Sequence, residues 1–469
     1  MEKTRNERKK AAKRGRRHRR ERRLTRIKVT SLVATVAALC VLAMLFASGA
    51  LRGNPEDTPA AQPIATQHAA STPDSTPAAS PESSGTPDEA STDAPIATPA
   101  ATPTPSPTPA PTPHVPRSAT IRSLGDFVIH DAIIRSAKKE GGGEYDFSPM
   151  FEMVKHVMGG ASYTVANVEG AMGGAGKRGY VGFPRFNTPP ELMAALLENG
   201  VDMLTLANNH ALDEYYDGLK ATMDNCDAYG LAFVGAARTR EERNTPVIVD
   251  IEGISVGFLN YTDHTNGREK GCSPDAVAFG VAYIRGADFK KDVDALKGAG
   301  ADVIVTYLHW GNEYVRKAEA RQTRVARQLA EAGVDVIVGT HPHVVQSPVE
   351  WISVTREDGS TGRTLCVYSL GNFISNQPQR FRDAGIVFEF TIEEIEEGKF
   401  EINSPKYIPT FYWTRGREKS GYTIRIVPCG EWLDERPEGM DKTTHDRVKQ
   451  VWKETIGLLG EEVAVASAN

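Results

Sequence analysis

The chain is poor in cysteine, and its five cysteines are not spaced for metal binding. Cys40 lies in an apolar segment, and Cys226, Cys272, Cys366 and Cys429 show no Cys-x-x-Cys pairing, which argues against a cysteine-ligated zinc site. In an oxidising compartment some of them could pair as disulfides, with buried free thiols as the alternative. The sequence also has no Gly-x-x-x-x-Gly-Lys-Ser/Thr loop, so no ATP-binding motif of that type drives bond formation.

Basic residues are missing from a long stretch between Arg52 and Arg117, where Pro, Thr, Ala and Ser are frequent. Such a segment cannot bury enough apolar surface to fold. Its prolines favour extended, stiff conformations. We therefore predict that residues 52–116 are a disordered linker. Residues 117–469 are long enough to form one large core or a core with an added subdomain.

Acidic residues are scarce at the N-terminus, where residues 1–28 hold 15 Lys and Arg against 3 Asp and Glu. Residues 29–51 follow without a charged side chain and are long enough to cross a bilayer as a helix. The basic flank predicts a cytoplasmic N-terminus and an extracellular main domain, in a single-pass protein of the bacterial cell membrane. The alternatives are a cleaved signal peptide with its cleavage site in residues 47–50, or a buried core helix.

The basic tail is expected to contact membrane lipid, because anionic headgroups attract clustered Lys and Arg. From Arg117 onward acidic residues outnumber basic ones, and the whole chain has a formal net charge of −5. The positive charge is therefore confined to the tail, and we expect no nucleic-acid partner.

Short apolar runs alternate with helical patterns along the folded domain. Residues 119–124 and 302–308 are typical of the predicted strands, and residues 214–229 of the predicted helices. Thr188, two prolines and Glu191 have the spacing of a capping box at a helix start. This alternation predicts an α/β domain with a layered core.

Six polar motifs directly follow apolar strand runs: SLGD, ANVEG, ANNH, LHWG, GTHPH and SLGNF. Ligand-binding groups collect at the strand ends of α/β domains, so we expect one site at one edge. Carboxylate oxygens and imidazole nitrogens suit Mn, Zn or Fe, which predicts one or two divalent metal ions. The candidate metal ligands are Asp126, Glu169, Asn209, His309, His341 and His343.

Taken singly, each candidate has an ordinary structural explanation. Asp126 could cap a turn, and His309 beside Trp310 could be a hydrogen-bonded core histidine. The pair His341 and His343 is stronger, because alternate residues can present two imidazoles to neighbouring ions. The whole set at predicted strand ends favours a metal site.

His210 is a candidate catalytic residue of a different kind. Asp213 lies three residues later, where a carboxylate can orient the imidazole and hold it protonated. We therefore predict that His210, assisted by Asp213, gives a proton to a leaving group. The alternative for Asp213 is a simple helix cap. Candidate substrate-binding residues are Asn167, Arg185 and Asn372.

These motifs resemble the CapA family, linked to poly-γ-glutamate capsule synthesis, whose domain is similar to the calcineurin-like metallophosphoesterases. The specific matches include NNHxxD at residues 208–213, HWGxEY at residues 309–314 and GTHPHVVQ at residues 339–346. The resemblance implies a metallophosphoesterase-like β-sandwich flanked by helices. It also implies two metals with shared ligands: Asp126 and His343 on one, Asn209, His309 and His341 on the other, and Glu169 bridging.

The sequence departs from the metallophosphoesterase pattern at one ligand position, where Val128 stands in place of a histidine. The resemblance implies a metal-dependent hydrolase or transferase acting on a phosphoester or an anionic cell-surface polymer, within a capsule-synthesis membrane complex. The alternatives are a non-catalytic assembly subunit of such a complex and, less favoured, a wall-binding module.

Overall fold

The computed structural model describes residues 115–174, 176, 178–356, 359–416, 421–460 and 464–465. The predicted basic tail, the apolar segment and nearly all of the linker lie outside the described residues, so these remain predictions. Within the described part of the chain, no helix is both long and apolar enough to span a membrane.

The first sheet has nine strands, in the order β14-β13-β12-β1-β2-β3-β4, with β11 also pairing with β1 and β15 with β13. Strands β1 to β4 run parallel, whereas β12 to β14 pair antiparallel. The bounds are β1 (Ser118–Val128), β2 (Tyr163–Glu169), β3 (Met203–Thr205), β4 (Ala232–Val234), β11 (Asn372–Ser375), β12 (Ala384–Glu396), β13 (Lys399–Gly416), β14 (Tyr422–Pro428) and β15 (Ala464–Val465).

The second sheet has six strands, in the order β5-β6-β7-β8-β10-β9. Strands β6, β7, β8 and β10 are parallel, and β5 and β9 are antiparallel edges. The bounds are β5 (Val247–Ile251), β6 (Ile254–Thr262), β7 (Val303–His309), β8 (Val336–Thr340), β9 (Val349–Thr355) and β10 (Thr361–Val367).

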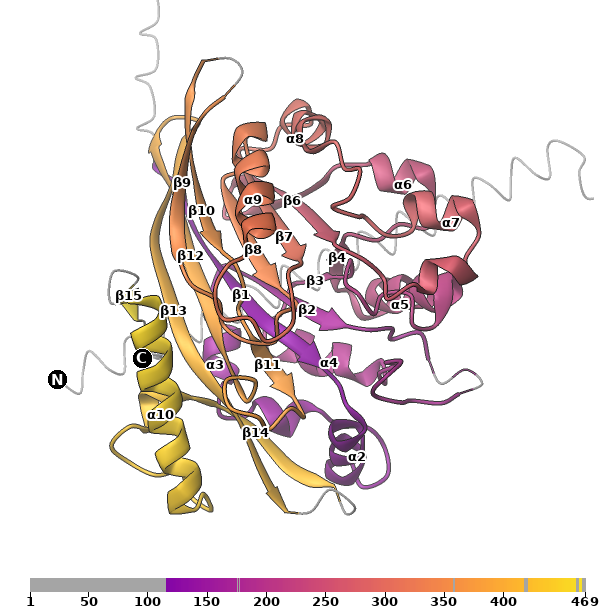
Figure 1. Cartoon of the computed structure of the whole chain (residues 1–469), viewed down its shortest axis with the longest axis vertical. Coiled ribbons are helices and arrows are strands. Elements are labelled where there is room, and N and C mark those ends of the chain that lie inside the picture. The colour runs from indigo at the N-terminus through magenta and orange to yellow at the C-terminus, as the bar shows by residue number, and fades with distance from the viewer. Residues whose placement is uncertain are drawn as a thin grey trace, which may run out of the picture. The chain divides into compact units, whose positions relative to one another are not determined.

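The main core lies between the two sheets, where side chains such as Ile121, Val305 and Phe388 meet. Helices cover the outer faces, so the sandwich has helix, sheet, sheet and helix layers (Figure 1). The helices are α2 (Asp131–Glu140), η1 (Ser148–Phe151), α3 (Lys155–Met158), α4 (Glu191–Glu198), α5 (Tyr215–Tyr229), α6 (Arg240–Asn244), η2 (Arg268–Gly271), α7 (Pro274–Phe279), α8 (Phe289–Gly298), α9 (Ala320–Ala332), η4 (Cys429–Trp432) and α10 (Lys442–Leu459).

The predicted layered α/β architecture is confirmed, but one local prediction is wrong. Helix α4 begins at Glu191 with Pro190 at its N-cap, and no side chain caps it. The Thr188 backbone N–H donates to Ala171 O at 2.8 Å, which keeps Thr188 in the preceding loop. The capping box is therefore not formed.

The four described cysteines are free thiols. Cys226, Cys366 and Cys429 are buried, and burial strongly raises their thiol pKa values. They behave as small core residues, which is the second of the two alternatives left by the sequence.

Candidate metal centre

The parallel strands of both sheets deliver the candidate ligands to one edge. Asp126 lies near the end of β1, Glu169 ends β2 and His309 ends β7. The turn after β8 brings the His341 backbone N–H to 3.1 Å from Asp126 Oδ2, although 215 positions separate the two residues. The strand-end arrangement thus gathers side chains from both halves of the sandwich.

Gly125 allows this close approach of the chain segments. A Cβ atom at Gly125 would lie 2.3 Å from Gly371 O, a contact that real side chains do not make. The next backbone N–H, that of Asp126, donates to Gly371 O at 2.9 Å. The glycine therefore lets Asp126 sit against the strand that follows the SLGN turn.

Glu169 lies among three of the histidines and is the most unusual residue of the site. Its side chain is fully buried, and neither carboxylate oxygen has a hydrogen-bond partner in the described part of the chain. Oε1 lies 3.7 Å from His210 Nε2 and 3.9 Å from His309 Nε2, and Oε2 lies 3.8 Å from His343 Nε2. Burial raises the pKa of Glu169. A buried carboxylate without donors is costly, and a cation held beside it would remove that cost.

Two groups of possible ligands share Glu169. One comprises Glu169, His309 and His341, and the other comprises Asp126, Glu169 and His343. Within each group the donor atoms lie within 4.8 Å of one another, and every residue is buried. The structure thus arranges the side chains in the two sets that the resemblance implied, with a carboxylate between them.

The first group has its imidazoles already converged. His341 Nδ1 lies 3.1 Å from His309 Nε2, which lies 3.0 Å from Asn209 Oδ1. Nitrogen ligands of a tetrahedral zinc ion lie about 3.3 Å apart, given bonds of about 2.0–2.1 Å. Burial lowers the pKa of His309 well below its usual range and that of His341 to about 4, helped by neighbouring imidazoles. Both rings are therefore neutral near pH 7, the state that ligation requires.

The second group is held by two asparagines. Asn167 Nδ2 donates to Asp126 Oδ1 at 2.7 Å, and Asn372 Oδ1 lies 3.0 Å from His343 Nδ1. These contacts orient the candidate ligands, as outer-shell partners do in metal sites. Burial lowers the pKa of His343, but the carboxylates of Glu169 and Asp126 outweigh it and raise the pKa to about 9. Both asparagines are buried behind the ligands, and substrate contact by either stays a prediction.

Val128 is buried in β1 and supplies no donor to this group. The nearest histidine in sequence, His130, does not replace it. Its Nδ1 lies 3.0 Å from Val128 O and accepts from the Asn376 backbone N–H at 3.3 Å. The second group therefore has one imidazole, whereas the first has two.

His210 faces Glu169 and is oriented from behind. Its Nδ1 lies 2.7 Å from Asp213 Oδ2, which also accepts the Phe186 backbone N–H at 2.6 Å. Burial lowers the pKa of His210, but the Asp213 hydrogen bond and the charge of Glu169 outweigh it and raise the pKa. Asp213 is not a helix cap, because Glu214 is the N-cap residue of α5. The pair has the geometry of an oriented proton donor.

Arg185 is the remaining sequence candidate, and it contacts the His210 side of the site. Its Nε donates to Asp213 O at 2.9 Å, and its guanidinium lies 5.2 Å from the centre of the Tyr215 ring. These contacts hold the backbone of Asp213. Substrate contact by Arg185 stays a prediction.

The sequence reasoning gave no role to two further residues beside the site. The Tyr314 ring lies 6.2 Å from the His343 ring. The guanidinium of Arg382 lies over the Tyr314 ring, 3.2 Å from its centre. Tyr314 belongs to the HWGxEY motif, which was a usable signal. Arg382 belongs to no motif and reaches the site through a loop after β11.

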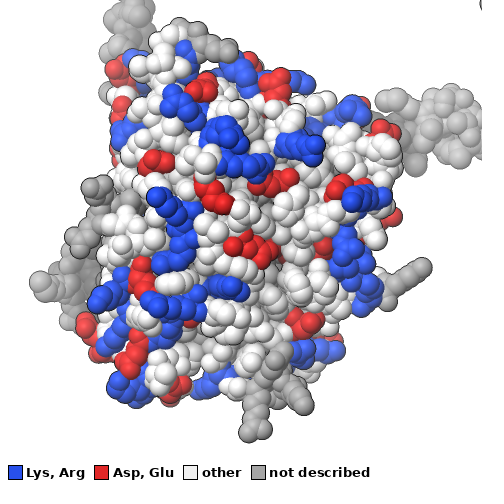
Figure 2. Space-filling model, viewed as in Figure 1, with Lys and Arg blue, Asp and Glu red and all other residues white. Residues whose placement is uncertain are grey.

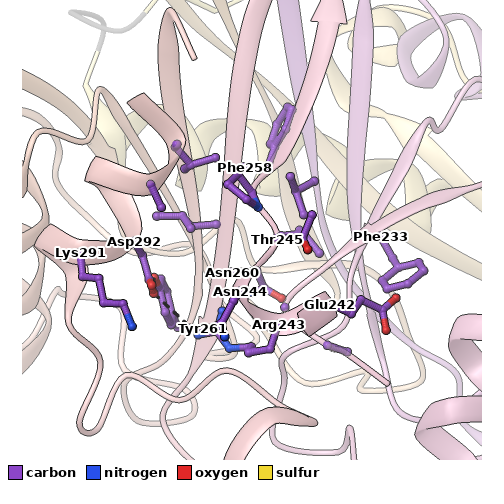
Figure 3. Close-up of a pocket in the computed structure, with 18 residues that line it drawn as sticks. Phe233, Glu242, Arg243, Asn244, Thr245, Phe258, Asn260, Tyr261, Lys291 and Asp292 are labelled. Carbon is purple, nitrogen blue, oxygen red and sulfur yellow. Dashed lines mark hydrogen bonds and ion pairs between the residues drawn. The ribbon is translucent and has the colours of Figure 1, made fainter. Parts of the chain in front are cut away.

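A cavity of about 440 Å³ lies elsewhere, between β4, α6, β6 and α8 (Figure 3). None of the candidate metal ligands lines it. This cavity and the candidate metal ligands thus lie at different places in the domain. The candidate site is assigned from its converging donors.

Solved structures overlap this chain only loosely. The calcineurin-like phosphoesterase YfkN from Bacillus subtilis is 13% identical, with a TM-score of 0.37, covering 73% of this chain and 99% of that one. The Haemophilus influenzae NAD nucleotidase is 11% identical, with a TM-score of 0.40, covering 75% of this chain and 64% of that one. Such low scores support no inference about activity.

Two curated relatives match more closely in sequence. The PGA biosynthesis protein CapA of Bacillus subtilis (strain 168) is 30% identical over 217 residues, which are 46% of this chain and 53% of the relative. The capsule biosynthesis protein CapA of Bacillus anthracis is 28% identical over 266 residues, 55% of this chain and 62% of the relative. The chain thus spans about half to three-fifths of the length of these relatives.

The family model described as "Bacterial capsule synthesis protein PGA_cap" matches residues 120–377, more than half of the chain. This segment includes every candidate ligand and the His210–Asp213 pair. The chain belongs to the PGA_cap family of bacterial capsule synthesis proteins.

Proposed function

We propose that this chain is a membrane-anchored, metal-dependent hydrolase of the phosphoesterase type that acts in capsule synthesis or export. The observation that carries the proposal is Glu169, a buried carboxylate shared by two ligand groups, with neither oxygen hydrogen-bonded. No protein donor satisfies it among the described residues, whereas one or two ions of Mn, Zn or Fe would.

Divalent ions at such a site lower the pKa of a bound water and stabilise charge on the attacking and leaving oxygens. Water adds to phosphorus as the ester P–O bond breaks, and the leaving oxygen needs a proton. His210 supplies it, because Asp213 holds Nδ1 and leaves Nε2 facing the Glu169 side. The Asp213 hydrogen bond and the charge of Glu169 also favour the protonated imidazole, because they raise the pKa of His210.

The place of action in the cell is part of the proposal. Residues 29–51 would anchor the chain, with residues 1–28 on the cytoplasmic face against anionic lipid and the domain outside. One relative is named for PGA biosynthesis and the other for capsule biosynthesis. We extend this to a capsule-synthesis membrane complex that handles an anionic polymer, poly-γ-glutamate, at the cell surface.

The alternative is a non-catalytic assembly subunit of the same complex. Val128 favours it, because a buried valine stands where the metallophosphoesterase pattern places a ligand histidine. In that case the metal would be structural. A His210→Ala variant would then support capsule formation in cells as well as the wild type does.

Metal content tests the proposal directly. The full chain, purified in detergent, is loaded with Mn²⁺ or Zn²⁺, desalted and measured by elemental mass spectrometry. We expect one or two ions per chain in the wild type and fewer in Glu169→Gln. His156→Gln is the matched control, since His156 pairs with Glu431 away from the site.

Hydrolysis of p-nitrophenyl phosphate and bis(p-nitrophenyl) phosphate is then measured on the same samples. Metal binding with turnover that falls in His210→Ala supports the enzyme. Metal binding without turnover of any ester favours the assembly subunit. A well-folded wild type that binds no metal would refute both metal-dependent forms of the proposal.

A further inference from the structure

Tyr314 sits beside the candidate metal centre in a strained conformation. Its φ is 68°, in the left-handed region that a bulky residue rarely adopts. His341 and His343 also have positive φ values, of 95° and 57°. The Tyr314 backbone N–H donates to Pro342 O at 2.7 Å, so the two strained segments are tied together. Strain of this kind persists where the surrounding structure enforces it, commonly at functional sites.

The Tyr314 ring is a platform between His343 and Arg382. It lies 6.2 Å from the His343 ring at an angle of 33°, and its centre lies 3.2 Å from the Arg382 guanidinium carbon. Asn372 braces both ends, because its amide contacts His343 and its Nδ2 donates to Arg382 O at 2.8 Å. A candidate ligand, an aromatic ring and a cation therefore lie side by side at the site.

The charge of Arg382 is not neutralised within the described residues. The neighbouring arginines, in contrast, form ion pairs. Arg380 pairs with Glu454 at 2.7 Å, and Arg447 pairs with Asp383 at 2.7 Å. No ion pair or side-chain hydrogen bond of the Arg382 guanidinium is found in the part of the chain that the structure describes. Cation–π stacking orients a guanidinium without using its N–H donors.

Tyr314 is 38% exposed, so solvent reaches the residue that lies beneath the Arg382 guanidinium. Glu313 is the nearby opposing charge, and its carboxylate interacts with the Tyr314 hydroxyl. Lys and Arg gather toward the left of Figure 2, with acidic side chains among them. The face seen in Figure 2 is therefore mixed in sign and shows no single broad basic surface.

We propose that Arg382, held over Tyr314, is a specificity-determining residue that binds an oxyanion of the substrate next to the reacting group. This rests on the proposed function for the reacting group, but the oxyanion subsite is a separate claim about binding. The guanidinium keeps its planar set of donors free for a carboxylate or a phosphate. A substrate with a second negative charge beside the scissile bond is therefore preferred over one without it.

The test uses the full chain in detergent and three variants. Arg382→Gln removes the charge, and Arg382→Lys keeps the charge but loses the planar fork. Arg380→Gln is the matched control, two residues away, with its charge already paired to Glu454. Binding of a γ-linked pentaglutamate and of inorganic phosphate is measured by calorimetry, with thermal unfolding to confirm the fold. The KM and kcat of the best phosphoester substrate are measured in parallel.

We expect Arg382→Gln to weaken oxyanion binding roughly 10- to 100-fold and to raise KM with little change in kcat, since it removes a charge-assisted hydrogen bond. The oxyanion affinity of Arg382→Lys should lie between those of the wild type and Arg382→Gln. The affinity of Arg380→Gln should stay within about twofold of the wild type. A loss confined to pentaglutamate assigns a carboxylate polymer, and a loss confined to phosphate assigns a phosphorylated substrate.

Equal effects of Arg382→Gln and Arg380→Gln would overturn the subsite, because they would show only a general charge effect. Unchanged binding of both probes in Arg382→Gln would also overturn it. Neither result would contradict the proposed metal centre. Conversely, Arg382-dependent binding in a protein without turnover would sustain the subsite and refute the hydrolase, so the two failures are distinguishable.

Discussion

The candidate metal centre and the cavity of Figure 3 differ in how the hydrogen-bonding capacity of their polar groups is satisfied. In the cavity, Tyr261 Oη donates to Asp292 Oδ2 at 2.6 Å, and Asn260 Oδ1 accepts the Ala207 backbone N–H at 2.7 Å. At the candidate metal centre, both oxygens of buried Glu169 lack a hydrogen-bond partner among the described residues. The cavity could hold more than a few water molecules, yet these two polar side chains in its lining are already hydrogen-bonded within the protein.

This difference has a structural origin. The cavity is lined by β4 at one edge of the first sheet and by β5 and β6 at one edge of the second. The edge of a sandwich leaves space where the two sheets are not closed by a further strand. The candidate metal centre lies at the ends of the central strands, where the fold itself supplies convergent side chains. The carboxylate of Glu169, which accepts no hydrogen bond among the described residues, and the cavity thus lie in different parts of the fold.

The largest expected effect comes from replacing Glu169 with glutamine. The variant keeps the shape but loses the shared charge, so metal should be lost and kcat/KM should fall at least about 10³-fold, equivalent to several kcal/mol. Stability should change in the opposite direction in the metal-free protein, because the variant removes a buried carboxylate whose oxygens accept no hydrogen bond among the described residues. Thermal unfolding with and without chelator measures the stability change, and elemental mass spectrometry and ester turnover measure the loss of metal and of kcat/KM.

A metal-free Glu169→Gln variant that unfolds at a lower temperature than metal-free wild type would contradict this account. It would mean that the carboxylate contributes to stability without an ion.

The second effect concerns the proton donor. His210→Gln should lower kcat about 10²- to 10⁴-fold, the usual contribution of a general acid. Metal content should stay at the wild-type value, because His210 belongs to neither group of possible ligands. Asp213→Asn, which only weakens the orientation of the His210 imidazole, should lower kcat by a smaller factor. Loss of metal in His210→Gln would show instead that the imidazole is a ligand.

The third effect is a pH dependence of metal affinity. The pKa of His343 is raised to about 9 in the metal-free protein, so it carries a proton at neutral pH and must lose it to become a ligand. His309 and His341 have lowered pKa values and are already neutral. Mn²⁺ affinity should therefore rise up to about tenfold per pH unit between about pH 6 and 8. Chelator competition at several pH values measures the slope.

A flat profile across that range would exclude His343 as a protonated ligand in the metal-free state. A hundredfold rise in Mn²⁺ affinity per pH unit would indicate that two protons are released on binding. The second would come from Glu169, whose pKa burial also raises.

The sequence predicted the layered α/β architecture because the buried parallel strands are long apolar runs and their neighbours have helical periodicity. It also predicted a set of residues that do come together, because residues at the ends of parallel strands share an edge. The grouping of Asp126 with His343, and of His309 with His341, came from the family resemblance rather than from spacing.

Other features were beyond the sequence for physical reasons. The amides of Asn167 and Asn372 hold ligands from behind, and nothing in their motifs separates that from substrate contact. Arg382 reaches Tyr314 through a loop with no periodicity and no motif. The α4 capping box failed because a tertiary contact of Thr188 outweighed a local preference. Long-range contacts decided each of these cases.

The smallest effect tests the cavity side of the comparison. Tyr261→Phe removes one hydrogen bond from a buried ring and leaves Asp292 with Arg243 at 3.7 Å. The free energy of unfolding should fall by about 1–2 kcal/mol, because Asp292 keeps a charged neighbour and some water. Metal content and turnover should match the wild type, since the cavity contains no candidate ligand.

β6 nevertheless continues from Tyr261 to Thr262, which pairs with His309 in the sheet register. If Tyr261→Phe changed metal affinity more than about threefold, that strand would be coupling the two regions, and a satisfied cavity would have to be counted as part of the functional site.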